Sequence, residues 1–152
     1  EISAIPDIMR LAHARGLRVA FNPAPMTAQV LAYPLDCVSL FVVNEIEAAG
    51  LSGETEPGLV LSAMRRRFPR AAVVMTMGAR GAAYADGDLT LTVPAEKVKA
   101  VDTTAAGDTF IGYFLAERLA GRDVETCLRT ACRAAAWCVT RAGAQDSIPR
   151  RE

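Results

Sequence analysis

The sequence predicts an α/β fold with a mainly parallel sheet and helices on both of its faces. Short apolar runs of strand length alternate along the chain with longer segments of helical periodicity, which is the pattern of such folds. The 152 residues are 51% apolar and 22% charged, a composition typical of a folded globular domain. A chain of this length is expected to form one domain or a part of one.

The first half of the chain predicts helices and strands in turn. Continuous apolar runs are typical of strands covered on both faces, and glycine or proline marks most of the helix ends. In chain order we expect a helix at Pro6–Arg15, a strand at Arg18–Phe21, a short helix at Thr27–Leu31, a strand at Val38–Val43, and helices at Glu45–Leu51 and Glu56–Phe68. The basic run 65–67 could be a phosphate patch, but solvated cations at a helix C-terminus are the simpler interpretation.

The second half predicts a strand, a hairpin and two long helices. We expect these at Ala71–Thr76, at Ala82–Ala85 with Leu89–Val93, and at Ala106–Ala120 and Val124–Ala142. The dipeptide Asp86-Gly87 favours the hairpin turn. The first expected element of the whole chain is a helix with no strand before it, and a sheet cut there would expose an edge. We therefore expect residues 1–152 to be part of a larger α/β domain.

Charge and cysteine content exclude several classes of function. Seventeen basic residues balance seventeen acidic ones, so no net charge favours nucleic acid or anionic lipid, and no apolar run is long enough to cross a bilayer. The cysteines form no C-x-x-C pair and His13 is the single histidine, which excludes the common zinc spacings. Buried thiols in a reducing compartment fit best, so we expect a cytoplasmic protein without nucleic-acid or membrane partners.

Four segments fall where expected strands end, which is where open α/β sheets bind ligands. They are Asn22–Pro25, Asn44–Glu47, Thr76–Gly81 and Asp102–Asp108. In the last of them, small residues lead into a helix whose first N–H groups attract anions, and the helix dipole keeps Asp108 ionised. A phosphate cradle beside a carboxylate suits phosphoryl transfer to a hydroxyl. The alternative is that a threonine or aspartate there only caps a helix.

Two of the three other segments, Asn44–Glu47 and Thr76–Gly81, support a binding function less strongly when each is taken alone. Asn44 and Glu47 could hold a hydrated magnesium ion, although acidic residues are common in the first turn of any helix. Thr76, Gly78 and Gly81 could let the backbone approach the phosphates of a nucleotide, or could form a plain turn. Neither a P-loop nor a dinucleotide fingerprint occurs in the chain.

These motifs together resemble the C-terminal half of the ribokinase-like (phosphofructokinase B-type) carbohydrate kinases. Asp102–Phe110 is similar to the family signature D-T-x-[GA]-A-G-D-x-F, and the other motifs follow in the expected order. Asn22–Pro25 and Thr140–Ser147 favour a member that converts D-ribose to ribose 5-phosphate. The resemblance covers most of the chain.

The resemblance implies a role for each matching residue. It implies that Asp108 is the general base, with an anion hole formed by Ala105, Ala106 and Gly107. It implies ATP and Mg²⁺ binding by Asn44, Glu47, Thr76, Gly78, Gly81 and Gly107, with Cys132 near the adenine. It implies a site for K⁺ formed by Asp102, Thr104, Arg141, Gly143 and Ser147, with Cys138 nearby. For both cysteines, a core position is the simpler interpretation.

Members of this family are about twice as long, and their N-terminal half carries most sugar contacts and a lid. The resemblance therefore implies a nucleotide-binding and catalytic segment that is nearly inactive alone, within a full-length homodimer that uses ATP and a small sugar. Three alternatives remain open at this point. The acceptor could be another sugar such as fructose or 2-keto-3-deoxygluconate, it could be a nucleoside, or the segment could be a non-catalytic nucleotide-binding module.

Overall fold

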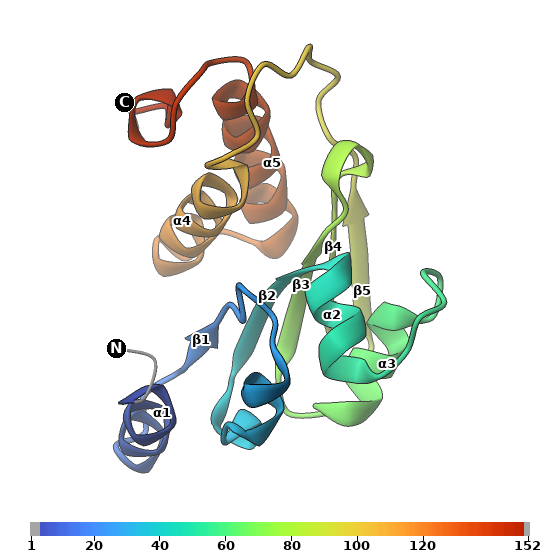
Figure 1. Cartoon of the computed structure of the whole chain (residues 1–152), viewed down its shortest axis with the longest axis vertical. Coiled ribbons are helices and arrows are strands. Elements are labelled where there is room, and N and C mark those ends of the chain that lie inside the picture. Colours follow the sequence, from blue (N-terminus) through green and yellow to red (C-terminus); the bar gives the residue numbers. More distant parts are fainter. Residues whose placement is uncertain (1–3, 151–152) are drawn as a thin grey trace. The chain divides into compact units, whose positions relative to one another are not determined.

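The strands follow the alternation expected from the sequence (Figure 1). The computed structural model describes residues 4–150, and within them five strands form one open mixed sheet in the order β1-β2-β3-β4-β5. They are β1 (Ala20–Phe21), β2 (Leu40–Asn44), β3 (Ala72–Thr76), β4 (Ala82–Asp86) and β5 (Leu89–Val93). β1 runs parallel to β2, and β4 and β5 form the expected hairpin. The predicted α/β class is confirmed.

The α-helices in the described residues are α1 (Ile5–Ala14), α2 (Glu45–Ser52), α3 (Val60–Arg67), α4 (Ala106–Leu119) and α5 (Val124–Val139). Two of them, α3 and α5, are shorter than expected by more than one residue. α3 begins four residues late, because Gly58 follows Pro57 and the segment forms a turn in which the Glu56 carbonyl accepts hydrogen bonds from Leu59 and Val60. α5 ends at Val139, where the Thr140 hydroxyl donates to the carbonyl of Trp137 and starts a tighter turn. The expected short helix at Thr27–Leu31 is a 3₁₀ helix at Ala28–Ala32.

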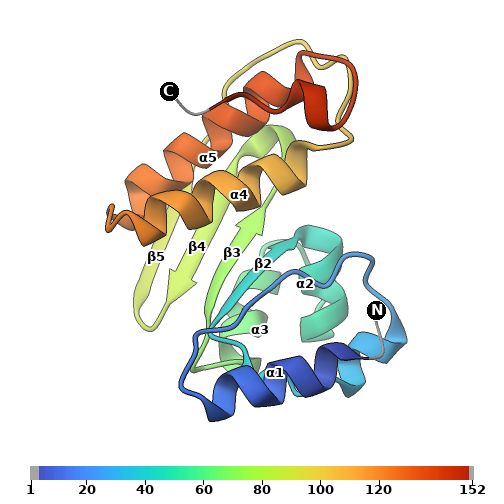
Figure 2. The same cartoon turned by 90° about the vertical axis from the view of Figure 1, so that its left-hand side faces the viewer.

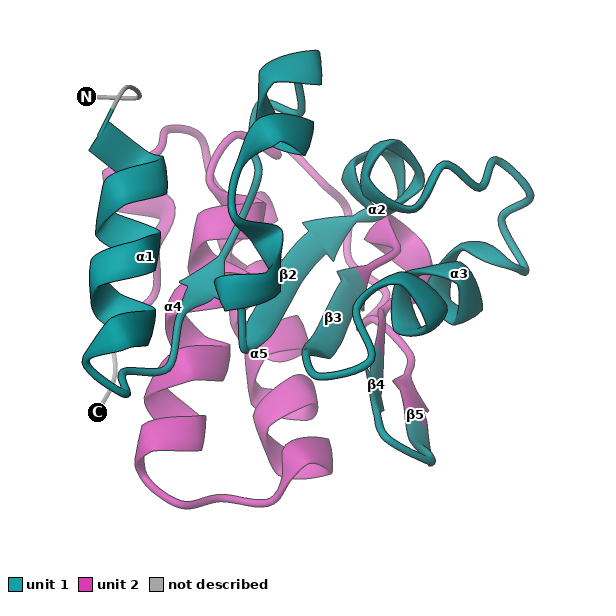
Figure 3. Ribbon diagram, turned by 90° about the horizontal axis from the view of Figure 1, so that it is seen from below, with its two compact units in different colours: residues 1–75, 84–90 teal, residues 76–83, 91–152 magenta. Residues whose placement is uncertain are grey.

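The chain forms two compact units (Figure 3). The first comprises Glu1–Met75 and Tyr84–Thr90, and the second Thr76–Ala83 and Leu91–Glu152. In the first, the continuous apolar run of β2 is buried as predicted, and the Phe41 ring lies 4.6 Å from that of Phe68 between centroids. Leu51 of α2 and Met64 of α3 are fully buried in this unit.

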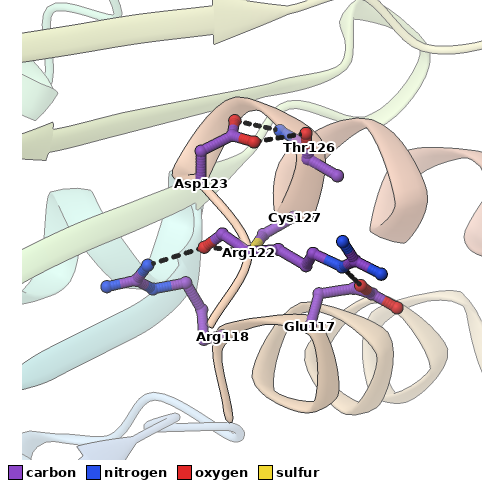
Figure 4. A network of polar contacts seen from close by, with 6 residues as sticks. All are labelled: Glu117, Arg118, Arg122, Asp123, Thr126 and Cys127. Carbon is purple, nitrogen blue, oxygen red and sulfur yellow. Dashed lines mark hydrogen bonds and ion pairs between the residues drawn. The ribbon is translucent and has the colours of Figure 1, made fainter. Parts of the chain in front are cut away.

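In the second unit, α4 and α5 lie side by side as a helical hairpin (Figure 2). The stacked rings of Phe110 and Phe114 and the buried Leu128 contribute to the apolar core. The turn between the helices is held by Asp123, whose carboxylate accepts hydrogen bonds from the Thr126 N–H and hydroxyl (Figure 4). Arg122 also forms an ion pair with Glu117 of α4, 3.9 Å apart. This turn sets the N-terminus of α4 beside the C-terminal half of α5.

No helix within residues 4–150 has the length and apolar character that a membrane span requires.

Candidate functional site

The second unit contains an open pocket of about 390 Å³, walled by four segments of the chain. These segments are the turn after β3, residues 95–100, the first turn of α4 and the C-terminal half of α5. Six residues that the sequence singles out line this one pocket: Thr76, Gly78, Gly81, Ala106, Gly107 and Cys132. Segments far apart in the chain thus contribute to a common cavity.

The turn after β3 owes its shape to two glycines. Gly78 and Gly81 both have positive φ angles, of 57° and 105°, and the Met77 N–H donates a hydrogen bond to the Gly81 carbonyl across the turn. A Cβ atom at Gly81 would lie 2.0 Å from the carbonyl oxygen of Val93. Gly81 is therefore required by the close approach of two backbone segments, and Gly78 by its conformation.

The first turn of α4 has unpaired N–H groups. Ala105 occupies the N-cap position, and no side chain caps the helix. The alternative that a threonine or aspartate only caps this helix is therefore wrong. Within residues 4–150, the N–H groups of Ala105, Gly107 and Asp108 have no hydrogen-bond acceptor, whereas that of Ala106 donates to the Thr103 carbonyl at 3.2 Å. Unpaired N–H groups at a helix N-terminus form an anion-binding site. Gly107 has open space where a side chain would be, which leaves room for a phosphate.

Asp108 lies in the same turn but lines a second pocket, of about 300 Å³, with Thr109, Tyr113 and Pro149 among its neighbours. Its carboxylate is exposed and forms no hydrogen bond or ion pair with another described residue. The Thr109 hydroxyl beside it is buried and is also without a partner in the described part of the chain. The helix N-terminus thus has the backbone of Gly107 facing one pocket and Asp108 facing another.

The residues expected around potassium occupy two loops that a carboxylate ties together. Asp102 accepts hydrogen bonds from the Thr104 hydroxyl and N–H on one oxygen, at 2.6 and 2.9 Å, and from the Gly143 N–H on the other, at 3.0 Å. These bonds lower the pKa of Asp102, the Thr104 hydroxyl most. Arg141 instead stacks over the exposed Trp137 ring.

Ser147 is buried, and its hydroxyl lies 3.1 Å from the Cys138 sulfur, so that Cys138 is indeed next to this loop. Cys132 is a buried member of the other pocket wall. Burial, followed by the negative charge of Glu96, raises the pKa of its thiol to about 11. Both thiols are core groups, as the simpler interpretation holds, and that of Cys132 remains protonated at neutral pH.

Asn44 and Glu47 belong to the first unit, where they form a reciprocal cap on α2. The Glu47 N–H donates to Asn44 Oδ1 and the Asn44 N–H donates to Glu47 Oε2, both at 2.9 Å. The Asn22 side chain also donates to Glu47 Oε2, at 3.3 Å. Glu47 is only 7% exposed. Within residues 4–150, no three acidic, cysteine or histidine side chains are grouped so as to hold a metal ion.

Sequence reasoning missed part of the pocket wall. Residues 95–98 form one side of it, and their position depends on the tertiary path after β5, which no local pattern indicates. The contribution of α5 could have been predicted from the sequence. Its pocket residues follow the i, i+3, i+4, i+7 spacing of one helix face, at Cys132, Ala135, Ala136 and Val139.

Comparisons with known proteins agree with this arrangement. Residues 3–151 match the model of the pfkB family of carbohydrate kinases. The chain is 39% identical over 160 residues to a ribokinase of Schizosaccharomyces pombe, covering 97% of this chain and 49% of that protein. It superposes on a crystal structure of ribokinase from Cryptococcus neoformans in complex with ADP, with a TM-score of 0.82 and 27% identity over 97% of this chain and 54% of that one.

A structure of Arabidopsis thaliana ribokinase complexed with ribose and ATP is also similar, with a TM-score of 0.79 and 27% identity, covering 93% of this chain and 47% of that one. The chain spans about half the length of these relatives. Since the family model matches almost every residue, the chain belongs to the pfkB family of carbohydrate kinases.

Proposed function

We propose that this chain is the nucleotide-binding and catalytic half of an ATP-dependent sugar kinase that converts D-ribose to ribose 5-phosphate. The observation that carries this proposal is the pocket that joins Thr76, Gly78 and Gly81 to the unpaired N–H of Gly107, one residue before an exposed Asp108. The likeness to ribokinases, one of them complexed with ribose and ATP, supports the choice of substrates.

In this proposal the residues of α4 perform the chemistry. Asp108 accepts the proton of the sugar's primary hydroxyl from its exposed position in the first turn of α4. The N–H groups of Ala105 and Gly107 stabilise the charge that develops on the transferred phosphoryl group. The Ala106 N–H joins them only if it leaves the Thr103 carbonyl.

The proposal also includes two ions, each argued from residues of one unit. Asn44 and Glu47 fit a magnesium ion that keeps most of its waters, since both hydrogen bonds accepted by Glu47 use Oε2 and leave Oε1 for such a water. A bound magnesium ion would neutralise phosphate charge. The two loops joined by Asp102 and Gly143 fit a potassium ion held by backbone carbonyls, with Thr104, Arg141 and Ser147 in the same loops.

The deciding experiment is Asp108→Asn in the full-length protein. We expect turnover to fall by about 10²–10⁴-fold, the usual contribution of a general base. The affinity for Mg·ATP, measured by calorimetry, should stay within a factor of about 3, because Asp108 lies outside the nucleotide pocket. Near-native turnover of the variant on every accepted sugar would disprove the role of Asp108.

The acceptor and the ions need separate measurements. A panel of ribose, fructose, 2-keto-3-deoxygluconate and nucleosides identifies the acceptor, and we expect ribose to have the highest kcat/KM. Replacement of potassium by tetramethylammonium should lower turnover if the two loops hold an activating ion. We also propose that the full-length enzyme is a cytoplasmic homodimer and that residues 1–152 alone bind nucleotide but are nearly inactive, which gel filtration and an activity assay test.

A further inference from the structure

The pocket of the second unit has an apolar wall with two charged side chains to which the proposed function gives no role. Ala135, Ala136 and Val139 of α5 line the apolar side. Glu96 and Lys97 are the charged residues of its lining, and neither forms an ion pair or hydrogen bond with another residue in the described range 4–150. Ligand pockets typically combine an apolar surface with a few polar groups that orient the ligand.

Glu96 and the α5 residue Cys132 both line the pocket. The negative charge of Glu96 acts on the thiol of Cys132, which stands one helical turn before Ala135 and Ala136 on the same face. The unpaired N–H of Gly107, by contrast, belongs to α4. The pocket therefore combines unpaired N–H groups on α4 with an apolar surface on α5, and the Glu96 carboxylate belongs to the same lining.

These two surfaces suit different parts of one nucleotide. The phosphates fit the N–H groups of α4, so the flat base fits against the alanines of α5. An ionised carboxylate only accepts hydrogen bonds, so the edge of the base that faces Glu96 must donate one. At position 6 adenine presents a donor amino group, whereas a 6-oxo purine presents an acceptor there and has its donor at N1 instead.

Resting on the proposed function, we propose that Glu96 is a specificity-determining residue that selects 6-aminopurine nucleotides by accepting a hydrogen bond from the 6-amino group. A 6-oxo group would bring two acceptors together and weaken binding. Since Glu96 is exposed and has no partner in the described chain, its side chain is free to make this contact.

The test compares ATP with inosine triphosphate, which differs at position 6, in calorimetry of the full-length protein. We expect the wild type to bind ATP about tenfold more tightly, as one charge-assisted hydrogen bond allows. Glu96→Gln should remove most of that preference, because an amide can either accept from the amino group or donate to the oxo group. The matched control is Glu125→Gln on α5, whose carboxylate pairs with Arg129 at 2.7 Å outside the pocket, and it should keep the wild-type ratio.

The other outcomes distinguish a failure of this inference from a failure of the proposed function. Equal affinities in the wild type, or an unchanged ratio in Glu96→Gln, would overturn the inference and leave the proposed function intact. The inference would also be overturned if Glu96→Gln weakened the binding of ATP but not that of 2′-deoxy-ATP, because Glu96 would then bind the ribose rather than the base. If the wild type binds neither nucleotide, the proposed function itself fails. A circular dichroism melt of each variant verifies that the fold is retained.

Discussion

Helices α2 and α4 begin in opposite ways. At α2 the side chains of Asn44 and Glu47 pair with each other's backbone N–H groups, so its first turn is largely satisfied from within. At α4 the N-cap residue is Ala105, and the N–H groups of Gly107 and Asp108 have no acceptor in the described chain. Both segments stood out in the sequence as candidate ligand sites, and only the first has a side-chain cap.

This difference distinguishes a helix start that is stabilised by its own side chains from one that is available to bind a ligand. A side-chain cap typically contributes about 0.5–2 kcal/mol, and α4 gives up that stabilisation. The small residues before Asp108 also leave its N–H groups accessible. An uncapped, accessible first turn that lines a pocket is therefore the stronger indication of an anion site, whereas α2 needs the separate argument of a free Glu47 oxygen.

The largest effect that would sharpen this comparison is expected from Gly107→Ala. The Cβ atom meets nothing within 4 Å, so the helix should gain roughly 0.5–1 kcal/mol of unfolding free energy. The same methyl group would keep a phosphate away from the N–H groups, so we expect the Kd for ATP to rise by about tenfold or more. Thermal unfolding and calorimetry measure the two effects.

The control for this change lies in the same helix. Gly112→Ala also meets open space, and it should stabilise α4 by a similar amount without changing the Kd for ATP. If Gly107→Ala bound ATP as the wild type does, the first turn of α4 would not be a phosphate site.

A smaller effect is expected at α2. Asn44→Ala removes the acceptor for the Glu47 N–H, and the unfolding free energy should fall by about 1 kcal/mol in a denaturant titration. Glu47→Gln is the matched control, since glutamine also closes a capping box and should preserve stability. Glutamine keeps the hydrogen bond of Glu47 and removes only its charge. An equal loss of stability in both variants would therefore show that the cap depends on that charge and not on hydrogen-bond geometry alone.

The smallest effect concerns pH and the loop of Asp102. Its folded-state pKa lies below the ordinary value of 3.8, so the loop contributes stability above that pH and loses it as the pH falls further through the folded-state pKa. We expect the Tm of the wild type to fall more steeply below pH 4 than that of Asp102→Asn. Parallel Tm profiles would show that the carboxylate does not hold the two loops together.

Some features of the site were predictable because they depend on local chemistry. The turn at Gly78 and Gly81 has positive φ angles that favour glycine at both positions. The start of α4 is marked by small residues before an aspartate. The cap at Asn44 and Glu47 was not expected, although its spacing is local, because the same residues also suit a metal ion. The expected start of α3 at Glu56 was wrong for a comparable reason, since Pro57 suits both a first helical turn and a preceding bend.

Local sequence patterns alone predict the order of strands and helices, the hairpin and the side chains and glycines that could form a site. Periodicity and turn residues act over a few positions, and no distant contact is needed to read them. The tertiary structure decided which of these groups meet. Glu96, Cys132 and Gly107 line one pocket only because the chain path after β5 and the α4–α5 hairpin bring them together. Such long-range placement arises from burial of apolar faces, which many sequences satisfy and no local motif specifies.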